Sequence, residues 1–149
     1  MAEHAELIEN AFVNYLEPLA GWSAGLLIFP GENNLDKTGA RIVAYVEGDL
    51  GEEDPPTSGN RWADVVVELR TPFQNKTPAL NPQTQHSANA AILATAISSA
   101  TLPDLLTAAI ANFTCQGITE RTPMRSQESN YWMSGWKVKI YSCPASFPN

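Results

Sequence analysis

The sequence predicts a single α+β domain over residues 1–149, with a mostly antiparallel sheet of about five strands. Two segments, 61–70 and 136–141, alternate apolar and polar residues with a period of two. This alternation is typical of strands with one packed face and one face open to water or to a partner. Between them, residues 87–100 are rich in alanine and predict a thin helix that can lie close on the sheet.

The N-terminal segment 3–20 predicts an amphipathic helix that packs on this sheet, because apolar residues recur every three or four positions. Glutamates in its first turns suit the positive end of the helix dipole, and Gly21 supplies a stop. Two short strands are expected next, at 26–29 and 40–46. The residues predicted on the packed face of the helix are Ile8, Phe12, Tyr15, Leu16 and Leu19.

The second half of the chain predicts further helical turns and two more strands. Residues 105–111 give one or two turns after a break at Pro103, 113–119 predict a strand, and 131–142 predict the last strand. The packed side of that last strand is expected to hold Trp136, Val138 and Ile140. Three polar or proline-rich stretches are expected to project as loops, at 47–60, 71–86 and 120–130.

The net charge of −7 is unevenly distributed along the chain. Residues 1–60 hold eleven acids and two bases, 61–114 are balanced, and 115–149 carry four bases and two acids. A net negative charge repels phosphate, so the charge distribution does not predict a surface that binds DNA. The asymmetry favours head-to-tail contacts between copies or with a partner, although a solvated surface is the simpler interpretation of any single charge.

No basic segment followed by an apolar stretch marks an export signal, and no apolar run approaches the roughly 20 residues that span a bilayer. The sequence therefore predicts a soluble protein made in a cytoplasm, with no membrane partner. Its two cysteines, Cys115 and Cys143, are expected to be reduced thiols, and a disulfide stays open if their strands are neighbours. Their spacing does not predict a metal site with His4 and His86.

The sharpest motif match is the segment 21–25, Gly-Trp-Ser-Ala-Gly, which has the G-x-S-x-G pattern of a nucleophile elbow. In an elbow a strand precedes the serine and a helix follows it, whereas here the predicted helix comes first. We therefore interpret the two glycines as a turn from helix to strand and predict no catalytic residue. His86 and several acids follow Ser23 in the order of a hydrolase triad, but any chain of this length offers that much.

The loop at 47–60 contains five acids and no base. Its carboxylates could hold a divalent cation, but the spacing of an EF-hand is absent, so we predict a hydrated loop and no metal or other cofactor. Trp22 and Trp136 are expected in the core, whereas aromatic residues beside polar loops are either core-edge residues or interface anchors. The residues predicted to form an assembly interface are Glu47, Asp49, Glu52, Glu53, Asp54, Trp62, Phe73 and Trp132.

The order of elements resembles that of the tail terminator (tail completion) and neck proteins, which join head to tail in tailed bacteriophages. The resemblance rests on the N-terminal amphipathic helix, the R-W-A-D-V-V-V-E-L strand at 61–69, the alanine-rich helix and the closing W-x-x-x-W-x-V-x-I strand at 132–140. These features cover nearly the whole chain. The proline-rich connection 71–86 and the loop 120–130 depart from the family pattern.

This resemblance implies a structural virion protein that forms a ring with itself, commonly a hexamer. Such a ring caps the tail, contacts the tail tube protein and the head connector or adaptor protein, and lets DNA pass through without specific binding. It also implies assembly in the host cytoplasm and a final place in the tail or neck of the virion. Two other classes stay open, a monomeric α+β module that binds a small ligand and a serine hydrolase that uses Ser23.

Overall fold

The computed structural model of the chain describes residues 3–36, 38–53, 58–73, 81–128 and 130–144. Its elements are α1 (His4–Leu16), β1 (Leu27–Pro30), the 3-10 helix η1 (Glu32–Asp36), β2 (Arg41–Glu47), β3 (Arg61–Pro72), α2 (Pro82–Ile97), α3 (Leu102–Ala109), β4 (Phe113–Gln127) and β5 (Tyr131–Pro144). They form a five-stranded sheet in the order β1-β2-β3-β5-β4. Only β1 and β2 pair in parallel, so the sheet is mostly antiparallel and the predicted α+β class is confirmed.

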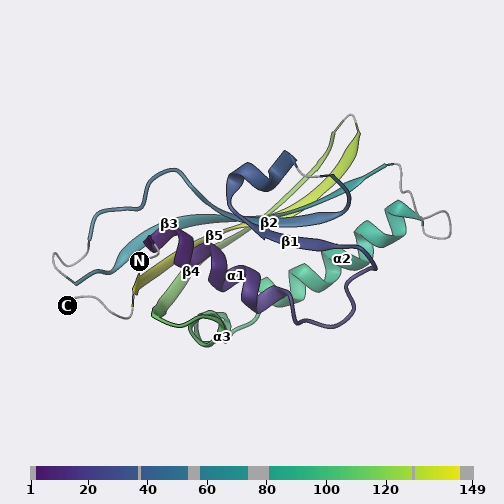
Figure 1. Cartoon of the computed structure of the whole chain (residues 1–149). Helices are drawn as coiled ribbons and strands as arrows, with labels where there is room; N and C mark the ends of the chain where they lie inside the picture. The colour runs from purple at the N-terminus through teal and green to yellow at the C-terminus, as the bar shows by residue number, and fades with distance from the viewer. Residues whose placement is uncertain (1–2, 37, 54–57, 74–80, 129, 145–149) are drawn as a thin grey trace.

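The helices α1, α2 and α3 lie on one face of the sheet, and η1 lies on the other (Figure 1). We call these the helix face and the open face. The predicted alternation is confirmed, since Val65, Val67 and Leu69 of β3 are fully buried in the core on the helix face. In β5, Val138 and Ile140 are equally buried, and their neighbour Trp136 packs partly exposed against the same core.

The first helix is shorter than the predicted segment 3–20, because α1 ends at Leu16, just before Pro18. A proline has no N–H for the helix ladder, and its ring clashes with the preceding turn. The carbonyl of Leu16, at the end of the helix, then accepts from the indole Nε1 of Trp22 at 2.9 Å and from the N–H of Leu19 at 3.1 Å. The packed stripe follows the expected spacing, with buried residues Leu7, Ile8, Ala11, Phe12, Val13 and Leu16.

The predicted loop 71–86 is wrong at both ends. The strand β3 continues to Pro72, and the helix α2 begins at Pro82 instead of residue 87. The side chain of Asn81 accepts hydrogen bonds from two N–H groups of the first turn of α2. An asparagine N-cap followed by proline is a regular helix start, and it lies outside the alanine-rich part that suggested the helix.

Proline also starts the next helix. The helical turns predicted at 105–111 lie at Leu102–Ala109, and Pro103 stands in the first turn of α3. The first turn of a helix leaves its N–H groups without intrahelical partners, so a proline there removes no hydrogen bond. The break between the two helices comes at 98–101, and Pro103, which we expected to mark it, lies in the first turn of α3.

The predicted loop 120–130 is also wrong, because β4 continues to Gln127, where it pairs with Trp132 of β5. This outer part of the hairpin is polar on both faces and mostly exposed in β4, so it lacks the apolar alternation of a half-buried strand. As an edge strand, β4 tolerates Pro123 and two irregularities in its register. A proline-containing, bulged edge is a poor template for pairing with another sheet.

On the open face, η1 is fastened to the sheet by two arginines. The guanidinium of Arg41 in β2 donates to the carbonyl of Leu35 at 2.9 and 3.1 Å and to that of Gly39 at 2.7 Å. Arg70 in β3 reaches the carbonyl of Leu35 at 3.4 Å. Part of the open face is therefore covered, and Val43 on it is fully buried, which the alternation alone did not predict.

Candidate functional site

The acidic residues predicted for an assembly interface lie where β2 ends and β3 begins. Glu47, Asp49 and Glu52 are exposed there. Glu53 is partly buried, and its carboxylate lies 3.7 Å from the guanidinium of Arg61. The fifth predicted acid, Asp54, lies outside the described residues. We call Glu47, Asp49, Glu52 and Glu53 the acidic end of the sheet.

The segment that carries these acids is tied to the domain, which corrects the expectation of a projecting loop for residues 47–53. The N–H of Gly51 donates to the carbonyl of Trp62 at 2.9 Å, and Leu50 packs partly buried against the core. Trp62 in turn lies against Tyr141 of β5, with ring centroids 4.8 Å apart. The acidic end therefore has a defined position relative to the sheet.

Phe73 and Trp132, also predicted for the interface, lie at the other end of β3. Their rings meet edge to face with centroids 4.4 Å apart, and both side chains are partly buried. The N–H of Phe73 donates to the carbonyl of Asn130 at 3.1 Å, next to the start of β5. We call Phe73 and Trp132 the aromatic end of the sheet.

The structure thus separates the predicted interface residues into two groups. The strand β3 has 12 residues, from Arg61 to Pro72. At about 3.3 Å per residue, the acidic end and the aromatic end lie roughly 35 Å apart. The two ends therefore cannot form one site, but they can serve as two unlike surfaces of one subunit.

The open face between these ends is rich in carboxylates. Burial, followed by the carboxylates of Glu68, Glu32 and Glu47, raises the pKa of Tyr45 to about 12. Lys137 points to this face as predicted, and its ammonium lies 2.7 Å from the carboxylate of Glu47. The hydrogen bond that this ammonium donates to Glu47, followed by the negative charge of Glu47, raises the pKa of Lys137. Both side chains are about half exposed, so the pair contributes little to folding stability.

Ser23 lies in the turn between α1 and β1, so the expected order of helix before strand is confirmed. Its backbone N–H donates to Oδ1 of Asn89 at 3.0 Å, and its hydroxyl accepts from Nδ2 of Asn89 at 2.9 Å. The ring nitrogens of His86 instead lie 2.7 Å from the hydroxyl of Thr71 and 2.9 Å from that of Ser134. This geometry gives Ser23 a structural partner in Asn89 and engages the ring of His86 with two other hydroxyls.

We expect Ser23→Ala to keep any biological activity while lowering the free energy of unfolding by about 1–3 kcal/mol, because Asn89 is fully buried and loses one partner. Urea unfolding and labelling with a fluorophosphonate probe measure the two effects. Wild-type protein that reacts with the probe at Ser23, and folded Ser23→Ala that does not, would show that the serine is a nucleophile.

The two cysteines lie on neighbouring strands but on opposite faces of the sheet. Cys115 of β4 pairs in register with Ser142, whereas Cys143 of β5 pairs with Thr114. Both thiols are free, so the disulfide left open by the sequence is absent. Burial raises the pKa of Cys115 to about 11, so its thiol is an inert core group. No group of three His, Cys, Asp or Glu side chains that could hold a metal occurs among the described residues.

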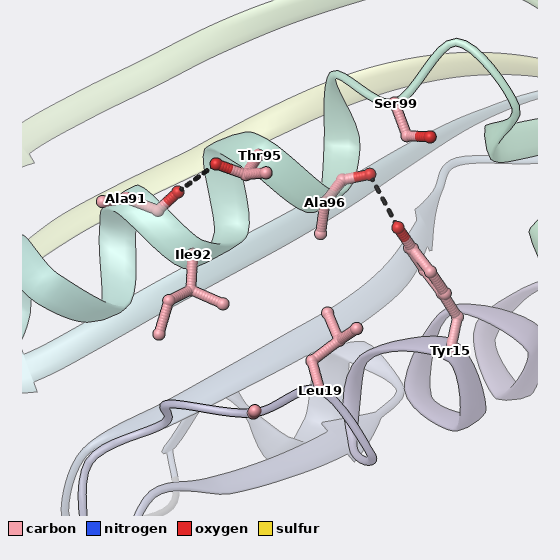
Figure 2. Close-up of a pocket in the computed structure, with 8 residues that line it drawn as sticks. Tyr15, Leu19, Ala91, Ile92, Thr95, Ala96 and Ser99 are labelled. Atoms are coloured by element: carbon pink, nitrogen blue, oxygen red, sulfur yellow. Dashed lines mark hydrogen bonds between the residues drawn. The ribbon is translucent and has the colours of Figure 1, made fainter.

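An apolar groove of about 530 Å³ opens between the end of α1 and the outer flank of α2. Figure 2 shows Leu19 facing Ile92 across it, with the hydroxyl of Tyr15 directed at the carbonyl of Ala96. That hydroxyl donates to the carbonyl at 3.0 Å. The hydroxyl of Thr95 also donates within its own helix. The polar groups of the groove are thus engaged inside the protein, which leaves mainly apolar surface for a partner.

Sequence reasoning missed three polar residues that organise the structure, namely Arg41, His86 and Asn89. The sequence pattern could have indicated two of them. His86 and Asn89 lie three positions apart, so they share one face of a helix whose other residues are mostly small. Arg41 lay on the face expected to be open, so its burial depended on η1, which the sequence pattern did not predict.

No protein-family model matches this sequence, and no curated protein is significantly similar to it. Within the described part of the chain, no single helix is long and apolar enough to cross a membrane. The pair α2 and α3 reaches the required length and composition only as two helices bent by 97°.

Proposed function

We propose that this chain is a structural subunit that assembles with itself into a ring, commonly a hexamer, at the end of a phage tail. The observation that carries the proposal is the separation of the acidic end from the aromatic end along β3. In a closed ring each copy meets its neighbours through two unlike surfaces. A subunit with an acidic surface and an aromatic surface at opposite ends of one rigid sheet is suited to such contacts.

In the proposed assembly the ring caps the tail tube and joins the tube protein to the head connector or adaptor protein. DNA passes through the centre of the ring. The net charge of −7 supports this role, because a negatively charged wall repels phosphate and does not hold the passing duplex. The anchoring of the acidic segment through Gly51 and Leu50 also supports it, since a fixed surface loses little entropy on assembly.

Electron microscopy of the purified protein, combined with native mass spectrometry, tests the proposal directly. We expect rings with a central hole and a mass that is a fixed multiple of the 16.2 kDa chain. A protein that stays monomeric at all accessible concentrations, both alone and with tail tubes, would contradict the ring.

Reversing charge at the acidic end should weaken self-association without unfolding the subunit. We expect Asp49→Lys with Glu52→Lys to raise the dissociation constant of the ring at least ~10-fold, because it removes acids that would face the more basic last third of the neighbouring copy, residues 115–149. Both residues are exposed, so the free energy of unfolding should change by no more than about 0.5 kcal/mol per site. Sedimentation over a range of concentrations and urea unfolding measure the two quantities.

The control for this variant combines Glu17→Lys, Ser98→Lys and Ala100→Lys, which changes the net charge by the same +4 at exposed positions beyond the ends of α1 and α2, away from the acidic end. Equal weakening in both variants would show that total charge governs association. Unchanged assembly of the Asp49 and Glu52 variant would exclude the acidic end from the ring contact.

The groove between α1 and α2 favours a second candidate, a monomeric module that binds a small apolar ligand. Its volume of about 530 Å³ lies within the usual range of ligand pockets, about 300–1,000 Å³. This candidate requires a protein that is monomeric in solution and a site that binds an apolar dye such as anilinonaphthalene sulfonate. Ala91→Trp places a large side chain in the groove and should abolish binding of the dye. If the protein instead forms the proposed ring, adding the dye should leave ring formation unchanged.

A further inference from the structure

The two halves of α2 are attached to the sheet in different ways. In the second half the buried residues are apolar, namely Leu93, Ala96 and Ile97. In the first half they are polar, namely Gln85, His86 and Asn89. Burial of apolar surface holds a helix without regard to pH, whereas polar contacts depend on the protonation state of the groups that make them. The first half of α2 therefore depends on hydrogen bonds for its position.

His86 makes the connection that reaches farthest into the sheet. Its Nδ1 lies 2.7 Å from Oγ1 of Thr71 in β3, and its Nε2 lies 2.9 Å from Oγ of Ser134 in β5. These hydroxyls lie on neighbouring strands, so one imidazole joins α2 to both. His86 is 8% exposed and Thr71 is 2% exposed, so little water can replace the contact between them, whereas Ser134 is partly exposed.

The contacts of His86 suit a neutral ring. A neutral imidazole donates through one nitrogen and accepts through the other, and each hydroxyl can complement it. A protonated ring donates through both nitrogens, so the hydroxyl that donated to it must turn away and find another acceptor in a buried place. Protonation therefore removes the acceptor of one hydroxyl hydrogen and places a positive charge among these contacts, which weakens the connection of α2 to β3 and β5.

The surroundings of His86 disfavour a positive charge. Among the described residues, the elements packed around it present no carboxylate on the helix face near the ring: α2 carries no acidic residue, and β3 and β5 offer Thr71, Ser134 and Trp132. The charged groups on this side come from β4, where Arg125 pairs in register with Ser134, and Arg121 donates to the carbonyl of Ser99. Burial, followed by repulsion from Arg125, lowers the pKa of His86 below its ordinary value of 6.5.

We propose that His86 is an acid-sensitive latch, whose protonation releases the first half of α2 from β3 and β5 while the second half stays packed. The direction of the pH dependence follows from the difference in the pKa of His86 between the closed and the open state of α2. When the latch is closed the ring stays neutral, and when it is open the ring titrates near pH 6.5. Opening therefore takes up a proton, and it becomes more favourable as the pH falls from about 6.5 toward the lower value of the closed state.

Hydrogen exchange measured by mass spectrometry on the full chain tests the latch. We expect the opening of α2 between His86 and Ile92 to increase by up to about tenfold per pH unit below pH 6.5, after correction for the intrinsic exchange rate. The amides of β3 from Val65 to Leu69 should show no such increase, because the core stays folded. Equal loss of protection in α2 and β3 would mean global acid unfolding and would overturn the proposal.

Two variants separate the latch from other acid effects. His86→Gln keeps a neutral hydrogen-bonding side chain and should make the opening of α2 independent of pH. His4→Gln removes the other histidine of lowered pKa, which lies 3.0 Å from the hydroxyl of Ser142 at the far end of the sheet, and should leave the behaviour of α2 unchanged. An unchanged pH dependence in His86→Gln, or its loss in His4→Gln, would overturn the proposal.

Should His86→Gln fail to fold, Arg125→Gln tests the latch by changing the charge beside His86 and leaving the histidine in place. Arg125 is exposed, and its removal lessens the repulsion on the protonated ring. The closed state then accepts a proton more readily, so the increase in opening between pH 6.5 and 5 should be smaller than in the wild type. An equal increase would show that another group drives the release of α2.

Discussion

Gly135→Ala should lower the free energy of unfolding by roughly 3 kcal/mol, the upper part of the usual range for overpacking a protein interior. Gly135 lies in the middle of β5, opposite Glu68 of β3. A Cβ at this position would lie 2.5 Å from the carbonyl oxygen of Val67 and 3.1 Å from Cα of Glu68. These atoms belong to the backbone of the central strand, so no side-chain rotation can relieve the contact.

Gly117→Ala in the adjacent strand β4 is the matched control. A Cβ there meets nothing within 4 Å, and Gly117 does not have a positive φ angle. An alanine at such a site narrows the unfolded ensemble, so the control should be neutral or should stabilise by up to about 1 kcal/mol. Urea unfolding of both variants measures the difference. Equal effects of the two substitutions would show that β3 and β5 can move apart without loss of stability.

The apolar face of the sheet could be predicted from the sequence, but the need for glycine at residue 135 could not. Alternation reports which side chains share a face, so Val65, Val67 and Ile140 were assigned correctly. The crowding at Gly135 arises from the backbone of β3, and the sequence of β5 contains no trace of it. A glycine required by a neighbouring strand is recognised only when the register between the two strands is known.

The outer part of the β4–β5 hairpin shows a second limit of sequence patterns. Residues 120–127 pair with β5, yet their side chains are mostly exposed and lack the apolar spacing that marks a strand. Pairing there depends on backbone hydrogen bonds to a neighbour that was itself predicted correctly. The family resemblance treated the loop at 120–130 as a departure, and the structure shows that most of this segment is strand.

The candidate assembly site was predicted residue by residue but not in its arrangement. The sequence indicated acids and aromatic residues beside loops, and the described members lie at the two ends of β3. Their separation depends on the length and direction of β3, which places Trp62 near one group and Phe73 in the other. Composition gave the chemistry of the two groups, whereas topology decides that they lie at opposite ends of β3.

The attachment of α1 gives the other large expected effect. Leu16→Ala should lower the free energy of unfolding by about 2–5 kcal/mol, because it removes a buried side chain and leaves a cavity that the surrounding residues fill only in part. Leu16 is the last residue of α1, has no exposed surface and belongs to the core on the helix face. Its loss also weakens the junction at which the chain turns from α1 toward β1.

Leu27→Ala deletes the same atoms from a leucine that is 56% exposed on the edge strand β1, so the cost should be no more than about 0.5 kcal/mol. The difference between the two variants in urea unfolding isolates burial, since side-chain chemistry and change in volume are equal. If Leu27→Ala were the more destabilising, the edge of β1 would be covered by a partner in the folded protein. The same measurement can be made on the dissociated monomer and on the assembled protein. If Leu27→Ala were mild in the monomer but strongly destabilising in the assembled protein, the edge of β1 would form part of the contact between copies.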